Sequence, residues 1–310
     1  MKKISVITPA FNEEENLPVV HAELIPVLEG LGMEWEWIII DDHSTDSTPD
    51  VIKGFARADS RIKGLRAAKN EGSHALCLFG FQKASGDCAV ILSADGQDAP
   101  GNIARLVEEM KKTGSKVVWL TREGGRDDPF FKRFMAGFYY FVMRRIMGVS
   151  SIPPDGGDMV LVRDGALDEI RKMRGKNINI LAAVAEVGFS QSRVPGERRA
   201  RVHGESRFTF SKNINLLFDT LTAHTVVPLR AITFLGFFTA FLGFLYGVNV
   251  VVAKFAGVPA EGWASLVLVV LILGGVQMVM LGIIGEYLWR TLENTRKQEV
   301  VVEERIGEWH

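Results

Sequence analysis

Two long uncharged apolar segments near the C-terminus constrain the fold of this chain more than any other feature. Residues 231–253 and 264–285 contain no Asp, Glu, Lys or Arg. Each exceeds the roughly 20 apolar residues that a helix needs to cross the hydrocarbon core of a bilayer. Two buried helices of a soluble core are the alternative, which the length of the segments and their lack of charge disfavour. The sequence therefore predicts two transmembrane helices that follow a soluble domain.

The charges around these segments predict their orientation. Arg230 precedes the first segment, and Arg290, Arg296 and Lys297 follow the second, whereas the connection at residues 254–263 contains one lysine and one glutamate. Lys and Arg are enriched on the cytoplasmic side of membrane helices. We therefore expect a multi-pass membrane protein whose soluble domain and two termini are all cytoplasmic.

The first 120 residues alternate between short apolar runs and segments with helical periodicity. The apolar runs predict strands at residues 4–8, 37–40, 62–66, 89–93 and 117–120. Helices are predicted at residues 15–30, from Ser47 or Thr48 onward, at 70–83 and at 103–112. Such alternation is typical of a parallel, doubly wound α/β sheet, in which ligands bind beyond the carboxyl ends of the strands.

Polar residues follow the first, second and fourth predicted strands. They are Asn12 and Glu13, Asp41 and Asp42, and Asp95 and Asp98. Each pair alone can be explained as a turn or a helix cap, with Asn12 as the N-cap of the first helix. Together they converge on one edge of the sheet. Clustered carboxylates there can hold Mg²⁺, which takes one or two of them and uses substrate phosphates and water as further ligands.

Beyond residue 122 the sequence is less regular and more basic. A helix is expected at residues 131–147, and a short strand at residues 159–162 follows a loop that ends in Asp158. Residues 193–207 are rich in arginine, and apolar residues at helical spacing within 211–224 predict a helix lying flat on the membrane interface. Arginines this close to a membrane segment favour contact with lipid phosphates, although a solvated face is the alternative.

The overall composition excludes few classes of protein. The 36 basic and 37 acidic residues leave a net charge of −1, which gives no indication of a charged partner. Two cysteines, Cys77 and Cys88, argue against a disulfide framework and favour a reducing compartment. No signal peptide is expected, because the first apolar run is short and leads into a turn at Pro9.

Several motifs together resemble family 2 glycosyltransferases of the GT-A fold. They are residues 4–14, residues 39–48 and Asp95-Gly96-Gln97-Asp98. Residues 69–72, 157–161 and 198–208 extend the resemblance to the polyprenyl-phosphate glycosyltransferases. The pair of C-terminal membrane helices is similar to that of the bacterial branch of this group, so the resemblance covers nearly the whole chain.

The resemblance implies a GT-A domain at residues 1–210, an interfacial helix at 211–228, two transmembrane helices within 229–289 and a cytoplasmic tail at 290–310. It implies an inner-membrane enzyme that transfers a sugar, with inversion, from a nucleotide sugar to a polyprenyl phosphate such as undecaprenyl phosphate. A UDP-hexose is the favoured donor, and Mg²⁺ or Mn²⁺ the expected cofactor. A homo-oligomer is expected, and no nucleic-acid partner. Gly243 and Gly247 form a small-residue face suited to close helix packing.

The resemblance also implies roles for individual residues. The expected catalytic residues are Asp95, Arg122 and Asp158, where Asp158 acts as a base or orients the sugar. Nucleotide binding is expected from Pro9, Phe11, Glu13, Asp42, Asp95 and Gln97. The metal is expected on Asp95, with Asp98 as the weaker candidate. The residues expected to bind the lipid phosphate are Arg122, Arg133, Arg201, Ser206 and Arg207.

Two positions depart from the motifs of the family. Ser93 stands in place of the first aspartate of an Asp-Ala-Asp motif, so the metal would depend mainly on Asp95, pyrophosphate oxygens and water. Arg207 stands in place of a common lysine, which keeps the charge but changes the geometry. A catalytically impaired scaffold that binds nucleotide sugar, or a glycosyltransferase with another acceptor, therefore remains an open alternative.

Overall fold

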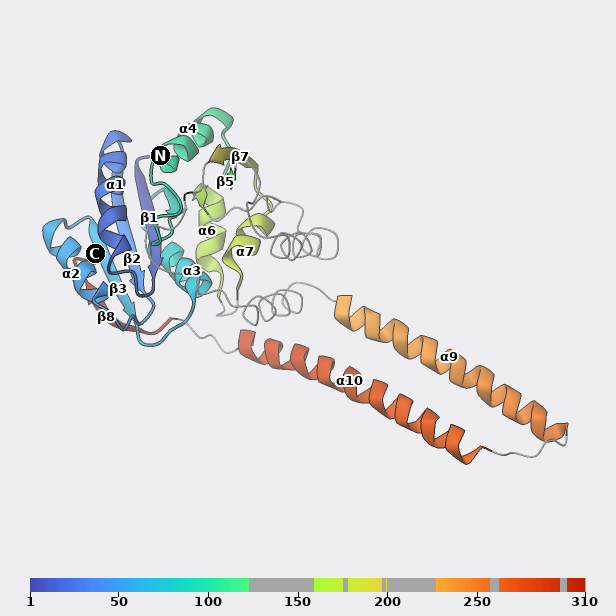
Figure 1. Ribbon diagram of the computed structural model, residues 1–310. Helices are drawn as coiled ribbons and strands as arrows, with labels where there is room; N and C mark the ends of the chain where they lie inside the picture. The colour runs from blue at the N-terminus through green and yellow to red at the C-terminus, as the bar shows by residue number, and fades with distance from the viewer. Residues whose placement is uncertain are drawn as a thin grey trace. The chain divides into compact units, whose positions relative to one another are not determined.

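The computed structural model describes residues 1–122, 159–174, 178–196, 199, 227–256, 262–295 and 300–309. The chain divides into two compact units. The first comprises Met1–Ile214 and Arg296–His310 and contains the sheet, and the second comprises Asn215–Thr295 and contains two long helices (Figure 1).

The first unit is built around one sheet, in which the described strands number eight, in the order β7-β5-β6-β4-β1-β2-β3-β8. The strands are β1 (Lys3–Ala10), β2 (Glu34–Asp41), β3 (Ile62–Ala67), β4 (Cys88–Ile91), β5 (Val117–Arg122), β6 (Val160–Arg163), β7 (Gln191–Gly196) and β8 (Val302–Ile306). β6 and β8 run antiparallel to their neighbours, and the other strands run parallel to one another. The predicted α/β sheet, mainly parallel, is confirmed.

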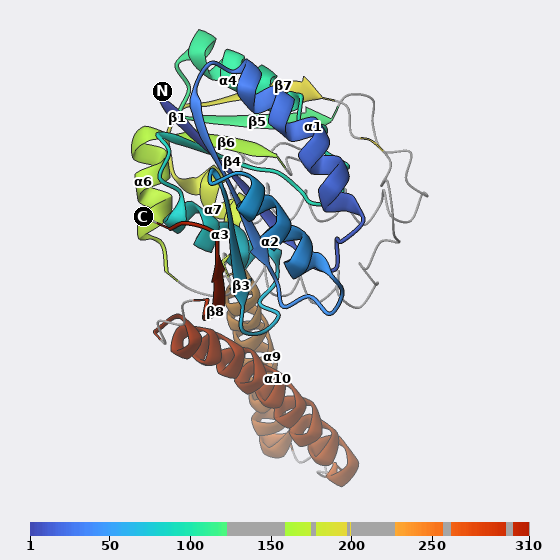
Figure 2. The same ribbon diagram turned by 90° about the vertical axis from the view of Figure 1, so that its left-hand side faces the viewer.

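Helices cover both faces of this sheet (Figure 2). On one face lie α1 (Asn16–Gly30), α2 (Thr48–Ala58) and α4 (Asn102–Thr113), and on the other lie α3 (Ser73–Lys83), α6 (Asp164–Lys172) and α7 (Ile180–Glu186). Successive strand residues point to opposite faces, so Val6 packs in the core beside α1 whereas Ile7 packs in the core beside α3. A strand buried on both faces reads as a continuous apolar run, which is why the central strands could be predicted.

The two edge strands and two helices were not predicted from the sequence. β7 buries only Val194 and Gly196, and β8 buries only Ile306. Edge strands keep a polar, partly exposed composition and tolerate a proline such as Pro195. The segment at residues 290–310, predicted as a tail, thus contributes β8 to the sheet, and Arg193 of the arginine-rich stretch belongs to β7. The helices α6 and α7 are the other elements that the sequence analysis did not identify.

The first helix has the predicted bounds to within one residue, but its predicted N-cap is wrong. α1 starts at Asn16, with Glu15 at the N-cap position and no side-chain cap hydrogen bond. Asn12 is therefore not the N-cap, and Glu13 lies before the helix rather than in its first turn. Asn12 instead has a φ of 56°, a left-handed conformation that asparagine tolerates better than most residues. Its side chain serves the loop described below.

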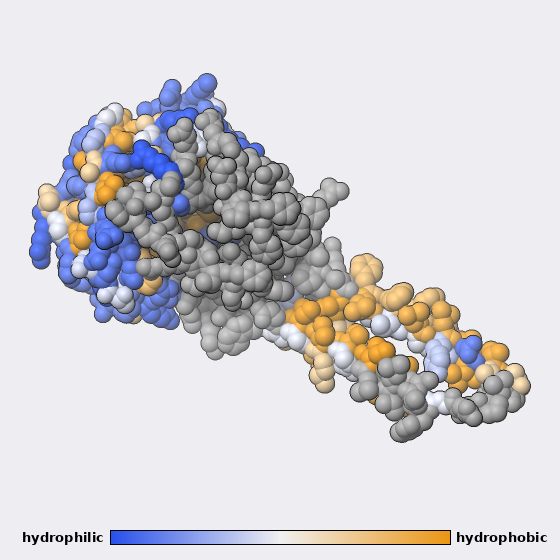
Figure 3. Space-filling view, viewed as in Figure 1, coloured by the Kyte–Doolittle hydropathy of each residue, from blue (hydrophilic) through white to orange (hydrophobic). Residues whose placement is uncertain are grey.

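The second unit consists of α9 (Val227–Phe255) and α10 (Trp263–Thr295), which contain the two predicted apolar segments. Among the described helices, Ile232–Ala253 is long and apolar enough to cross a membrane, with a mean hydropathy of 1.9 and no buried residue after Ile232. Ile272–Gly285 of α10 is a shorter apolar stretch. Figure 3 shows apolar residues over the described surface of both helices, where Phe234 and Phe237 are 74% and 73% exposed. Such helices need an apolar environment.

A buried carboxylate ties β2 to its neighbours away from the carboxyl edge. Glu36 accepts hydrogen bonds from Ser5 Oγ at 2.6 Å, from the Ser85 amide at 2.7 Å and from Lys63 Nζ at 3.0 Å, with Lys3 Nζ at 3.3 Å. Burial by itself raises the pKa of Glu36, but these hydrogen bonds outweigh it and lower the pKa to about 2. The carboxylate is therefore charged in the folded chain.

Replacing this carboxylate is expected to destabilise the sheet. Glu36→Gln removes the buried counter-charge of two partly exposed lysines and one acceptor of a hydrogen-bond network, which costs about 1–3 kcal/mol. Because the folded-state pKa is depressed, the contribution of Glu36 is complete above the ordinary value of 4.5 and is lost as pH falls toward about 2. Thermal unfolding of the detergent-solubilised chain measures both effects. The exposed neighbour Glu34→Gln is the control, and equal unfolding temperatures of the two variants would contradict the role of Glu36.

Candidate active site

The ends of the strands bring the predicted polar residues to one edge of the sheet. The carboxyl ends of β1, β2, β3, β4, β5 and β7 lie at this edge because these strands are parallel. β6 and β8 are antiparallel, so their first residues, Val160 and Val302, lie at the same edge. Loops that follow some strands and segments that precede others therefore meet there.

The loop after β1 is bound to the loop after β2. The Asn12 amide donates to Ser44 Oγ at 2.9 Å, and Asn12 Oδ1 accepts from the Thr45 amide at 2.9 Å. The Glu13 amide donates to Thr48 Oγ1 at 2.8 Å. These bonds fix the two loops against each other before any ligand arrives. The two joined loops form one wall of the candidate site. The predicted pocket residues Pro9, Phe11 and Glu13 are all partly exposed on this wall.

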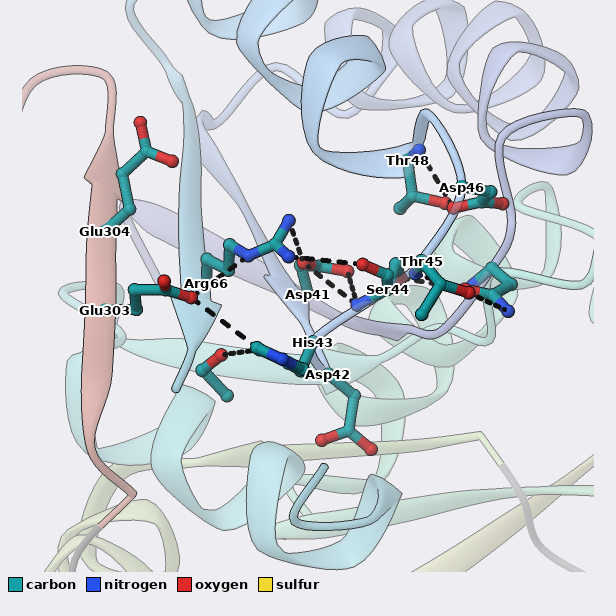
Figure 4. Close-up of polar contacts among 12 residues, drawn as sticks. Asp41, Asp42, His43, Ser44, Thr45, Asp46, Thr48, Arg66, Glu303 and Glu304 are labelled. Atoms are coloured by element: carbon teal, nitrogen blue, oxygen red, sulfur yellow. Dashed lines mark hydrogen bonds and ion pairs between the residues drawn. The ribbon is translucent and has the colours of Figure 1, made fainter. Parts of the chain in front are cut away.

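The two acids at the end of β2 have different partners. Asp41 is fully buried, accepts from the Ser44 amide at 3.1 Å and lies 3.4 Å from an Arg66 guanidinium nitrogen (Figure 4). Burial raises the pKa of Asp41, and the hydrogen bonds from Ser44 and the charge of Arg66 oppose that shift only in part. Figure 4 shows Asp42 pointing away from this arginine.

Asp42 organises the chain that enters α3. Its Oδ1 accepts from the Glu71 amide at 2.6 Å, and its Oδ2 accepts from the Gly72 amide at 3.0 Å. Its own amide donates to the Ala10 carbonyl at 2.8 Å. Burial raises the pKa of Asp42, and the two backbone hydrogen bonds oppose this shift only in part. Gly72 has a φ of 86°, which a side chain would disfavour. Asp42 thus joins the ends of β1 and β2 to the start of α3.

After β4 a tight loop holds two buried acids. Asp95 and Asp98 are 8% and 4% exposed. The Gln97 amide donates to Asp95 Oδ1 at 3.1 Å, and Ser93 Oγ donates to Asp98 Oδ2 at 2.9 Å. Ser93 therefore fixes the orientation of Asp98, where an aspartate would place a second negative charge beside it. Among the described residues, no group of three or more His, Cys, Asp or Glu is arranged to hold a metal ion.

Arg199 connects the basic stretch to this loop. Its amide donates to the Gln97 carbonyl at 2.9 Å, and a guanidinium nitrogen lies 2.9 Å from both carboxylate oxygens of Glu23 in α1. No individual role was predicted for Arg199, although it lies in the arginine-rich stretch at residues 193–207. Arg66 was also missed, because one arginine in a strand carries no signal of its own.

Some predicted site residues lie outside the part of the chain that the structure describes. They are Arg133, Asp158, Arg201, Ser206 and Arg207, together with most of the predicted interfacial helix, residues 211–226. The predicted helix at residues 131–147 also lies outside it. For Arg122 the backbone is described, at the carboxyl end of β5, but the side chain is not.

Comparison with known families assigns both units of the chain. Residues 5–171 match the family of glycosyl transferase family 2 domains, and residues 227–290 match the GtrB C-terminal hairpin. The undecaprenyl-phosphate 4-deoxy-4-formamido-L-arabinose transferase of Salmonella paratyphi B is 32% identical over 301 residues, which is 96% of this chain and 91% of that protein. An uncharacterized glycosyltransferase of Synechocystis sp. is 30% identical over 295 residues, which is 95% of this chain and 92% of that one.

Solved structures support the same fold. Glucosyl-3-phosphoglycerate synthase from Mycobacterium tuberculosis in complex with phosphoglyceric acid has a TM-score of 0.53 and 16% identity, covering 72% of this chain and 80% of that chain. The same enzyme with Mn²⁺, UDP and phosphoglyceric acid has a TM-score of 0.51 and 17% identity, covering 71% and 78%. The fold and the family matches define a glycosyltransferase with a GT-A domain. The chain belongs to glycosyl transferase family 2, in which it carries the GtrB type of C-terminal hairpin.

Loss of one carboxylate oxygen at Asp42 is expected to loosen the start of α3. Asp42→Asn keeps one acceptor but turns an amide N–H toward the other backbone donor, so Glu71 or Gly72 loses its partner. A buried N–H without a partner costs about 1–3 kcal/mol. Amide hydrogen exchange should therefore accelerate at the start of α3. The exposed Asp50→Asn in α2 is the control, and unchanged protection in Asp42→Asn would contradict this role.

Proposed function

We propose that this chain is a membrane-bound, inverting glycosyltransferase that moves a hexose from a UDP-sugar to a polyprenyl phosphate such as undecaprenyl phosphate. One observation carries the proposal: a single chain combines a GT-A sheet edge bearing buried carboxylates with an exposed apolar hairpin. The relative from Salmonella, named as an undecaprenyl-phosphate transferase, is similar along nearly the whole chain, which supports the acceptor.

In this proposal the donor nucleoside lies against the joined loops after β1 and β2. Pro9, Phe11 and Glu13 are accessible on that wall, and Asp42 lies behind it, so they form the nucleoside pocket, with Gln97 beside the pyrophosphate. Preformed loops lower the entropic cost of ordering a ligand. The mycobacterial synthase with the same fold was solved with UDP, which supports a uridine donor here.

The residues of the loop after β4 fit a divalent metal. Two buried carboxylates, with no described third acid grouped around them, suit Mg²⁺ or Mn²⁺, which completes its coordination with phosphate oxygens and water. Asp95 is the main ligand in this proposal, because it matches the second acid of the family's Asp-Ala-Asp motif, whereas Ser93 supplies no carboxylate at the first position. The bound metal would supply neutralisation of the charge that develops on the leaving diphosphate. The mycobacterial synthase was solved with Mn²⁺, which supports a divalent metal here.

The reaction in this proposal is a direct displacement. A lipid phosphate oxygen attacks the anomeric carbon while the bond from that carbon to the nucleoside diphosphate oxygen breaks, so the configuration inverts. The second pKa of a phosphate monoester is about 6, so the nucleophile is already deprotonated at neutral pH. Arg122 and Arg133 would bind the substrate phosphates, and Arg201, Ser206 and Arg207 would lie near the lipid. Asp158 would orient the sugar, since no base is required.

The hairpin would place this reaction at the inner membrane, with the sheet unit and both termini in the cytoplasm. The exposed apolar surfaces of α9 and α10 support insertion of both helices. At Gly243 and Gly247 an added Cβ would meet no described heavy atom within 4 Å, so this small-residue face is open. That opening supports close packing against a second copy in a homo-oligomer.

Asp95→Asn is the direct test of the metal and donor site. Transfer of radiolabelled sugar from a panel of UDP- and GDP-sugars to undecaprenyl phosphate by the wild-type chain should identify the donor. With that donor, the kcat/KM of Asp95→Asn should fall about 100-fold, as expected for loss of one catalytic electrostatic contact. Asp168→Asn, an exposed acid on α6, is the matched control. Full activity of Asp95→Asn would contradict the proposal.

Metal removal gives an independent prediction. Treatment with EDTA should abolish transfer, and excess Mn²⁺ or Mg²⁺ should restore it. The carboxylates of the site are themselves negative, so a metal cation is needed to neutralise the diphosphate leaving group. The scaffold alternative, which Ser93 favours, predicts binding of UDP-sugar without transfer at any metal concentration. Activity that EDTA leaves unchanged would overturn the metal assignment.

A further inference from the structure

β8, the first described strand after the hairpin, begins at the carboxyl edge of the sheet, where the candidate site lies. β8 pairs antiparallel with β3, and Val302 lies opposite Ala67 at the carboxyl end of that strand. The Ala68 amide donates to the Val301 carbonyl at 2.9 Å, which extends the pairing beyond the strand. In the sequence, only residues 296–301 separate α10 from β8. β8 is therefore the next described strand after the hairpin in the sequence, and its first residue lies at the edge that carries the candidate site.

Glu303 of β8 joins a chain of charges that leads into this edge (Figure 4). Its Oε2 lies 3.2 Å from Arg66 Nε and 3.6 Å from His43 Nδ1. The same guanidinium lies 3.4 Å from Asp41 Oδ2 and donates to the Ser44 carbonyl at 3.2 Å. Arg66 thus connects a half-exposed carboxylate of β8 to a fully buried carboxylate of β2.

The inner end of this chain of contacts is the wall proposed to receive the nucleoside. Ser44 is the residue whose hydroxyl accepts the Asn12 amide, and that bond joins the loops after β1 and β2. With Glu303 present, Arg66 has carboxylates on both sides, so its guanidinium is held in one orientation. Without Glu303, Arg66 would gain freedom to turn toward solvent, and the support of the Ser44 carbonyl would weaken.

We propose that Glu303 is a positioning residue for the donor pocket, which holds Arg66 and, through it, the Asp41–Ser44 loop in the conformation that binds the nucleotide. This inference rests on the proposed function. Exposed ion pairs contribute little to folding stability, so the effect should be in ligand binding rather than in unfolding. The strand after the hairpin is, in this proposal, part of the donor site's support.

The adjacent residue supplies a matched control. Glu304 lies on the same strand, opposite Arg66 in the β3–β8 pairing, and is also half exposed. Its side chain pairs with Lys53 of α2 at 3.0 Å, and Figure 4 draws no contact from that side chain to Arg66 or His43. Replacing it removes an ion pair of the same kind from the same strand. A general weakening of β8 would therefore affect both variants. An effect on the donor pocket would occur only in the Glu303 variant.

The test is titration of UDP and of the accepted UDP-sugar into the purified full-length protein, with steady-state kinetics. Glu303→Ala should raise the Kd and the donor KM about twofold to fivefold, as loss of one partly exposed ion pair would, with kcat unchanged. Glu304→Ala should match the wild type. In an Arg66→Met background, Glu303→Ala should add no further loss, because its effect passes through Arg66.

Three results would overturn the inference. If Glu303→Ala binds UDP with the same Kd as the wild type, Glu303 is not required to position Arg66. Equal losses of binding and of unfolding temperature in the Glu303 and Glu304 variants would show that β8 acts only as a strand. Additive losses in the Glu303 and Arg66 double variant would show that the two residues act separately. If the wild-type chain itself binds neither UDP nor a UDP-sugar, the proposed function fails, and this inference fails with it.

Discussion

The parallel pairing of β4, β1 and β2 is the constraint on which the rest of the site depends. Ile7 lies opposite both Ile38 and Ile91, and these strands are buried on both faces, so their register is fixed by the two helix layers. Fixed register sends the loops with Asn12, Asp42 and Asp95 to one edge. The hydrogen bonds between the loops after β1 and β2 then add precision to an arrangement that the sheet has already set.

The sequence was most informative where burial is complete. Central strands such as β2 read as continuous apolar runs, and the acids that end them could be assigned to one edge. Polar edge strands such as β8 carry no such pattern. Asn12 was misassigned because asparagine suits both an N-cap and a left-handed loop position. The Arg66–Glu303 contact joins residues 237 positions apart, so no local pattern could have indicated it.

In the proposed reaction, the two units would meet different requirements. A nucleotide sugar is water-soluble and highly charged, and its pocket needs preformed polar loops with buried carboxylates. A polyprenyl phosphate stays in the bilayer, and an apolar hairpin would keep the enzyme at that surface. The departure at Ser93 changes the charge of the loop after β4, because its hydroxyl orients Asp98 instead of adding a negative charge. In the proposed metal site, Asp95 would then be the principal acid.

The most direct test of this account is chemical analysis of the lipid that the purified protein makes. Vesicles containing undecaprenyl phosphate would be incubated with the protein, metal and the UDP-sugar that it binds, and the lipid fraction examined by mass spectrometry and NMR. The account predicts one hexose attached through a single phosphate, with the anomeric configuration opposite to that of the donor. A sugar diphosphate lipid, retained configuration, or tight donor binding with no glycosylated lipid would contradict it.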